Sequence, residues 1–78
     1  NGEYEVIEAE IIETSELINK ELNNSNLSDG IRIGAILRGE DIIIPRSNFI
    51  FKKEDIVVFL AKRDQLPVVE NMFRISSF

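Results

Sequence analysis

Three arginines, Arg32, Arg38 and Arg46, are the residues of this chain whose chemistry is best suited to binding a ligand. Arg32 and Arg38 are an even number of positions apart in one predicted strand, so we expect their side chains on the same face. Arg46 directly follows Pro45, at the end of the next predicted strand. A guanidinium group can donate two parallel hydrogen bonds to a phosphate or a carboxylate. The three side chains together therefore predict a binding site for a small anion on one side of a sheet.

The same arginines also have a plainer interpretation, because the first half of the chain is rich in glutamate. Residues 1–30 carry eight acids and one base, whereas residues 31–78 carry six acids and eight bases, and the net charge is −5. Arginines that pair with surface glutamates would add little stability. The acidic balance argues against a nucleic acid partner, since binding to phosphates relies on Lys and Arg. The residue pattern alone leaves both roles of the arginines open.

The chain is poorly supplied with groups for catalysis. It contains no His and no Cys, so it lacks the side chains that most often move protons or attack as nucleophiles at neutral pH. Two acid pairs, at residues 40–41 and 54–55, lie in predicted turns, where we expect the carboxylates to be solvated and adjacent side chains to point apart instead of toward one metal ion. The glycines do not have the spacing of a phosphate-binding loop. We therefore expect no catalytic residues, no metal site and no cofactor, and we predict that the protein is not an enzyme.

The first third of the chain predicts a strand followed by a helix. Residues 3–13 alternate glutamates with β-branched and aromatic residues, which is typical of an edge strand or a partly exposed strand. Ser15 is suited to cap a short helix that carries Leu17, Ile18 and Leu22 on one stripe. Asn, Ser, Asp and Gly accumulate in residues 23–30 and should end this helix.

The middle of the chain predicts a hairpin. Residues 31–37 alternate strictly, so one face of this strand should carry Ile31, Ile33, Ala35 and Leu37. Residues 39–41 then turn the chain into a second strand. Pro45 should either end the ladder of that strand or place the strand at an edge, because it has no N–H to donate.

The last third predicts a buried strand and a second helix. Residues 56–61 are continuously apolar, as in a central strand that is buried on both faces. Asp64 is suited to cap a helix over residues 64–73, with Pro67 tolerated in its first turn. The order strand-helix-strand-strand-strand-helix predicts an α+β fold, with a small mixed sheet of about four strands and two short helices. No run of about 18 apolar residues is present, so we expect one domain over residues 1–78 that does not insert into a membrane.

The stretch "IRIGAILRGEDIIIPRSNFIFKKEDIVVFL", residues 31–60, resembles the central signature of the TrkA C-terminal domain, also called the regulator-of-potassium-conductance C-terminal domain. The segments "SELINKEL" at residues 15–22 and "LPVVENMF" at residues 66–73 are similar to the helices on either side of that signature. The chain departs from the family pattern at Asn19 and Glu54, where Gly is usual, and at Ser47 and Asn48, which replace a Gly-Asp turn.

This resemblance implies a cytoplasmic homodimer that regulates a potassium channel or transporter at the membrane, as one piece of a larger protein. It also implies that a small anionic effector, such as cyclic di-AMP or another nucleotide, binds at the dimer interface. The matching positions give Arg32 as a phosphate or base contact, Ile33 and Ala35 as an apolar floor, and Pro45 at the rim; Arg38 and Arg46 join them as candidate donors. The alternative is a purely structural oligomerisation domain that binds no ligand, and a hydrolase fragment is a third and weaker interpretation.

Overall fold

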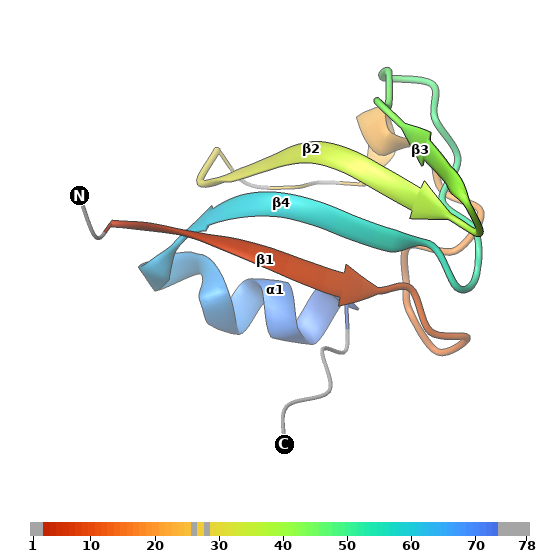
Figure 1. Ribbon diagram of the computed structural model, residues 1–78. Helices are drawn as coiled ribbons and strands as arrows, with labels where there is room; N and C mark the ends of the chain where they lie inside the picture. Colours follow the sequence, from red (N-terminus) through yellow and green to blue (C-terminus); the bar gives the residue numbers. More distant parts are fainter. Residues whose placement is uncertain (1–2, 26, 28, 74–78) are drawn as a thin grey trace.

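The computed structural model describes residues 3–25, 27 and 29–73, and it shows a four-stranded sheet with one α-helix (Figure 1). The elements, in chain order, are β1 (Tyr4–Glu10), the 3-10 helix η1 (Leu22–Asn24), β2 (Ile31–Arg38), β3 (Asp41–Ile43), β4 (Ile56–Lys62), the 3-10 helix η2 (Arg63–Gln65) and α1 (Leu66–Phe73). The strands are ordered β1-β4-β2-β3. The predicted α+β class is confirmed, and the sheet, expected to be mixed, is antiparallel throughout.

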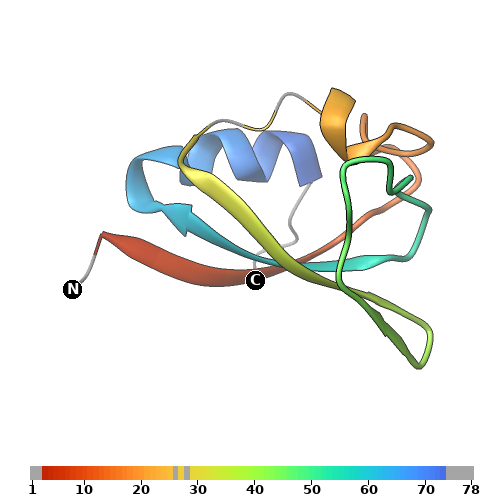
Figure 2. The same ribbon diagram turned by 90° about the horizontal axis from the view of Figure 1, so that it is seen from above.

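Helix α1 covers one face of the sheet and the other face has no layer of described residues over it (Figures 1 and 2). The rings of Phe59 on β4 and Phe73 on α1 stack with their centroids 5.0 Å apart. The loops that follow β1 and β3 close the same layer with Ile11, Leu17 and Phe51, all of them buried. The core therefore lies on one side of the sheet only, and it is built from residues distributed over almost the whole chain.

Strand β1 lies at one edge of the sheet and β4 in its interior, as predicted. The expectation that β4 is buried on both faces is wrong. Val57, Phe59 and Ala61 point into the core, whereas Leu60 on the other face is 43% exposed. A continuously apolar strand thus has one apolar face outside the core here, because α1 is the one α-helix of the described residues and covers the other face.

The β2–β3 hairpin forms as predicted. Arg38 pairs with Asp41, which leaves Gly39 and Glu40 as the two-residue loop. Gly39 has φ 61°, a value that favours glycine and that the first loop position of a type II′ turn requires. The ladder ends at Ile43, two residues before Pro45.

Strand β2 contains an irregularity that the sequence pattern did not predict. Its register with β4 shifts between Ile33 and Ala35, at Gly34, as in a β-bulge. Before the shift Ile31 and Ile33 face the core, and after it Ile36 does. The prediction that Ala35 and Leu37 share a face with Ile31 and Ile33 is therefore wrong, because the extra residue exchanges the two faces of the strand.

The segment that begins at Ser15 is a series of turns and a 3-10 helix, and the predicted α-helix is absent from it. The Ser15 hydroxyl does accept a hydrogen bond from the backbone N–H of Leu17 (3.1 Å), as a capping residue would, but it donates to the carbonyl of Met72 in α1 (3.1 Å). Asn19 has φ 66° and so interrupts any helix. The backbone here bonds instead to residues 47–51, for example from Leu22 N to Phe49 O (2.7 Å).

The final helix begins at Leu66 and carries Pro67 in its first turn, as predicted. Asp64 does not act as its cap, because Asp64 lies inside the 3-10 helix that leads into α1. Val69 and Phe73 are the buried residues of this helix. Among the described residues, no helix combines the length and apolar character needed to cross a membrane.

Candidate functional site

The bulge in β2 separates the predicted ligand residues. Arg32 pairs with Leu60 of β4, and Ala35 pairs with Val58, so both lie on the uncovered face of the sheet. Ile33 pairs with buried Phe59 and points to the core side. Arg38 follows Ile36 by two positions and lies on that side as well. The prediction that Arg32 and Arg38 share one face is therefore wrong. Two further residues, Pro45 and Arg46, follow β3 where the chain leaves the sheet.

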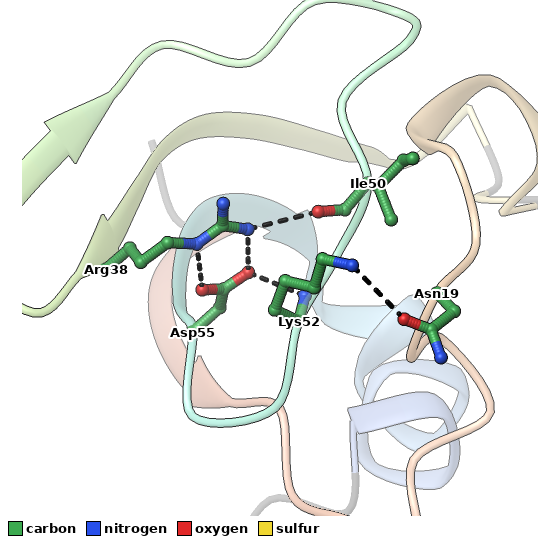
Figure 3. Close-up of polar contacts among 5 residues, drawn as sticks. All are labelled: Asn19, Arg38, Ile50, Lys52 and Asp55. Carbon is green, nitrogen blue, oxygen red and sulfur yellow. Dashed lines mark hydrogen bonds and ion pairs between the residues drawn. The ribbon is translucent and has the colours of Figure 1, made fainter.

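Arg38 is engaged within the chain (Figure 3). Its Nε donates to Oδ1 of Asp55 and its Nη2 to Oδ2, both at 2.8 Å, and Nη2 also donates to the carbonyl of Ile50 at 3.1 Å. The backbone N–H of Lys52 donates to the same carboxylate at 2.9 Å. The guanidinium carbon lies 5.0 Å from the centroid of the Phe49 ring. Arg38 therefore fastens the loop before β4 to the end of β2.

The electrostatics of this pair are consistent with a structural role. The hydrogen bonds to Asp55 raise the pKa of Arg38, and the nearby negative charge adds to the rise, while burial opposes it. Asp55 is 1% exposed, whereas the side chain of Arg38 is 39% exposed. Because a carboxylate that is removed from water needs donors around it, the three hydrogen bonds explain how Asp55 can be so deeply buried.

The uncovered side of the sheet, which we call the open face, presents a continuous apolar surface. The most exposed apolar side chains on it are Ile42 (73%), Val6 (71%), Tyr4 (48%) and Leu60 (43%). Ala35, Leu37, Ile56 and Val58 lie between them and are partly buried. A contiguous apolar surface across all four strands is typical of an interaction site. Sequence reasoning placed only the part on β2 near a site. The rest was missed because two helices were predicted, whereas α1 is the one α-helix of the described residues and covers a single face.

The charged side chains on the open face are separated by sign, with bases near one end of the strands and acids near the other. Arg32 stands opposite Leu60, and Lys62 lies two positions further along the same face of β4, so the two bases are diagonal neighbours. The Nζ of Lys62 lies 5.9 Å from the Tyr4 ring centroid. At the other end of β1, Glu8 and Glu10 stand opposite Val58 and Ile56. The face therefore offers positive charge beside apolar side chains at one end, and Lys62 is a candidate ligand residue that sequence reasoning did not identify.

Two surface hollows lie away from the centre of this face. One, of about 360 Å³, is lined by Glu3, Lys62, Arg63 and Asp64. The other, of about 210 Å³, is lined by residues 10–13 with Lys53 and Glu54. Within residues 3–25, 27 and 29–73, no group of three or more acidic side chains is placed to hold a metal ion.

Comparisons with known proteins agree with this architecture. The family model of the TrkA-C domain matches residues 6–74. The Trk system potassium uptake protein TrkA of Azorhizobium caulinodans is 38% identical over 76 residues, which cover 97% of this chain and 17% of that protein. The chain thus spans about a sixth of this relative.

Two solved structures share the fold. The C domain of the potassium transport protein KtrA, in complex with cyclic di-AMP, superimposes with a TM-score of 0.74 at 24% identity, covering 86% of this chain and 80% of that one. The RCK_C domain dimer of S. agalactiae BusR, also in complex with cyclic di-AMP, gives a TM-score of 0.76 at 21% identity, covering 95% and 94%.

The antiparallel four-stranded sheet and the helix that covers one of its faces define a small α+β domain. The family match over most of the chain makes the assignment specific. The chain belongs to the TrkA-C domain family.

Proposed function

We propose that this chain is the regulatory domain of a cytoplasmic subunit of a potassium transport system, and that it senses a small anionic effector as a homodimer. The observation that carries the proposal is the open face, where Arg32 and Lys62 stand beside exposed apolar side chains. Relatives named as potassium uptake proteins and fold neighbours solved with cyclic di-AMP support it. In this proposal residues 1–78 form one domain of a larger protein, without enzyme activity, that reaches the membrane through its transporter partner.

The proposed dimer places two open faces against each other. Burial of apolar side chains would drive association, at roughly 25 cal/mol per Å² of apolar surface removed from water. A two-fold axis near β2 brings Arg32 of both copies to one cleft, which suits an effector with two phosphates. Ala35 supplies apolar floor beside Arg32, and Pro45 and Arg46 lie at the rim.

Two of the expected ligand residues act indirectly in this arrangement. Ile33 points toward the core, so it supports β2 from the side opposite the open face. Arg38 holds the loop of residues 49–55 to the end of β2 and thereby fixes the path of the chain that follows Pro45. An effector regulates such a dimer only if it binds one relative orientation of the two copies more tightly than another.

The experiment is calorimetric titration of cyclic di-AMP and adenine nucleotides into the protein and into Arg32→Ala. We expect the replacement to weaken binding of the effector by about tenfold to a hundredfold, because hydrogen bonds to a charged group are lost. Lys20→Ala, a change of an exposed base outside the sheet, is the matched control and should bind as the original chain does. Identical heats in the original chain and Arg32→Ala would contradict the proposed site.

A purely structural oligomerisation domain is the second candidate, and the continuity of the apolar open face favours it. In that case the chain dimerises but its melting temperature does not respond to any nucleotide. A sensor is stabilised by roughly RT ln(1 + [L]/Kd) when the effector is added. A thermal-shift series with cyclic di-AMP, adenine nucleotides and divalent ions separates the two candidates.

A further inference from the structure

The outer edge of β1 is a second surface, and within the described part of the chain its backbone has no partner strand. Strand β1 stands at the end of the sheet and pairs only with β4. The carbonyl of Glu3 accepts from Arg63 N (3.0 Å), and the N–H of Ile11 donates to Asp55 O (2.8 Å), so odd-numbered residues bond toward β4. Backbone groups alternate in direction along an antiparallel strand. The N–H and C=O groups of Tyr4, Val6, Glu8 and Glu10 therefore point outward.

This edge carries charged side chains, which hinder pairing with another acidic strand, but it lacks the backbone features that prevent strand addition. Proteins commonly blunt an edge strand with proline, with a bulge or by making it very short. Strand β1 has seven residues, contains no proline and keeps an unbroken register with β4. One side chain on it, Val6, is 71% exposed. The outward backbone groups of these four alternate residues can therefore pair with an extended segment.

The side chains beside this edge specify what kind of segment fits. Tyr4 and Val6 form an apolar half on the open face, and Glu8 and Glu10 form an acidic half. Among the described residues neither Glu8 nor Glu10 makes an ion pair, whereas Glu5 on the opposite face pairs with Arg63 at 3.3 Å. Cross-strand neighbours of opposite charge stabilise a sheet, and like charges destabilise it.

We propose that β1 binds an extended, basic segment of a partner protein by strand addition. The segment runs antiparallel to β1. It carries Lys or Arg at two alternate positions, opposite Glu10 and Glu8, followed by apolar residues at two alternate positions, opposite Val6 and Tyr4. Main-chain hydrogen bonds hold the segment, and the alternate side chains give the specificity. This binding site is distinct from effector sensing and does not depend on it.

A second copy of the chain fits the same edge less well. Two antiparallel β1 strands avoid direct contact between glutamates when Val6 faces Glu8 or when Val6 faces Val6. In the first register the Glu8 side chains of the two copies are diagonal neighbours and repel each other, and in the second Glu8 faces Tyr4, so neither register places a base opposite the glutamates. The charge pattern therefore favours a basic partner over self-association at this edge.

The test uses a capped seven-residue peptide with Lys at positions 1 and 3, Val at positions 5 and 7, and Thr between them. Amide hydrogen exchange of the 78-residue chain is followed by NMR as the peptide is added. We expect slower exchange at Tyr4, Val6, Glu8 and Glu10 and no change at the odd-numbered amides, which β4 already protects. The same peptide N-methylated on the amides that face β1, and a version with Glu in place of Lys, are the controls and should bind at least about fivefold more weakly.

Variants of the chain give a second test, in which the protein is changed and the peptide is not. Val6→Pro removes one outward N–H without removing a hydrogen bond to β4, so the fold should persist while binding weakens by about fivefold. Glu8→Lys combined with Glu10→Lys should reverse the preference from the Lys peptide to the Glu peptide. Unchanged exchange at the even-numbered amides overturns the proposal. Protection that depends on protein concentration and not on peptide overturns it in favour of self-association.

Discussion

Asp55 and Arg38 show how one buried charge can organise a loop. The carboxylate of Asp55 accepts from two guanidinium nitrogens and from the backbone of Lys52, and almost none of the residue is exposed to water. The same guanidinium reaches the carbonyl of Ile50, so a single side chain connects the end of β2 to both ends of a short loop (Figure 3). Asp55 also stands next to Glu54, whose φ of 75° bends the backbone there.

Replacing Arg38 should therefore destabilise the fold. We expect Arg38→Ala to lower the free energy of unfolding by about 2 kcal/mol, because a buried carboxylate loses two of its donors. Arg38→Lys keeps the positive charge but cannot bind in the same two-pronged way, so its loss should be smaller. Urea denaturation gives both values, and Arg46→Ala is a control on an exposed arginine. Equal urea midpoints for Arg38→Ala and Arg46→Ala would contradict the structural role of Arg38.

At the scale of elements, the segment after β1 does not form the predicted helix and instead contacts distant parts of the chain. Ser15 is buried and bonds to the carbonyl of Met72 in α1, and residues 19–22 bond to the loop of residues 47–51. Helix propensity is a weak preference that tertiary contacts can override. The segment thus joins the helix to the long loop and closes one end of the core.

Ser15→Ala should loosen this junction. The backbone N–H of Leu17 and the carbonyl of Met72 would each lose a partner at a place with little water, so we expect a loss of about 1–2 kcal/mol in the free energy of unfolding. Thr14→Ala, at an exposed neighbouring position, should change stability by less than about 0.5 kcal/mol. Thermal unfolding followed by circular dichroism measures both. Equal melting temperatures for the two variants would show that the buried hydroxyl contributes nothing.

Alternation and turn chemistry predicted most of the strands, and they failed where one residue changed the register. The hairpin at Gly39, the end of the ladder before Pro45 and the edge position of β1 follow from local rules. The bulge at Gly34 does not follow from these rules, because a regular strand and a bulged strand differ here only in which side chains they turn toward the core. The prediction of three arginines on one face failed for that reason. The acidic pair at residues 54–55 was expected to be solvated, which is wrong for Asp55, and its part in holding Arg38 was missed.

For the whole molecule, the proposed association through the open face would contribute to stability. A domain of 78 residues buries only about 60% of the surface of its unfolded chain, so its core alone leaves a small margin. Covering the open face with a second copy would add the missing layer. The fold is then more stable at higher protein concentration, since binding that favours the folded state raises the apparent stability.

Leu60→Glu tests this arrangement directly. Leu60 lies at the centre of the open face and is partly exposed, so a single copy should tolerate the change, while a charge buried between two copies should prevent dimerisation. Val68→Glu changes a comparably exposed residue on α1, on the far side of the sheet, and is the control. Sedimentation equilibrium should give a monomer for Leu60→Glu and a dimer for Val68→Glu. A dimer in both would place the interface elsewhere.

The extra residue in β2 has a consequence for reading related chains. Removing Gly34 from the strand would leave every other residue with its present partner in β4, so the guanidinium group nearer the N-terminus and the one nearer the hairpin would stay on opposite sides. A gap of one position in an alignment at this point would therefore leave the two arginines in their present roles. In a chain of the same length that pairs Gly34 regularly with β4, the arginine that secures a loop would instead turn to the open face and become available to solvent or to a ligand. Pairing at Gly34, as much as residue identity, distinguishes these two uses of arginine.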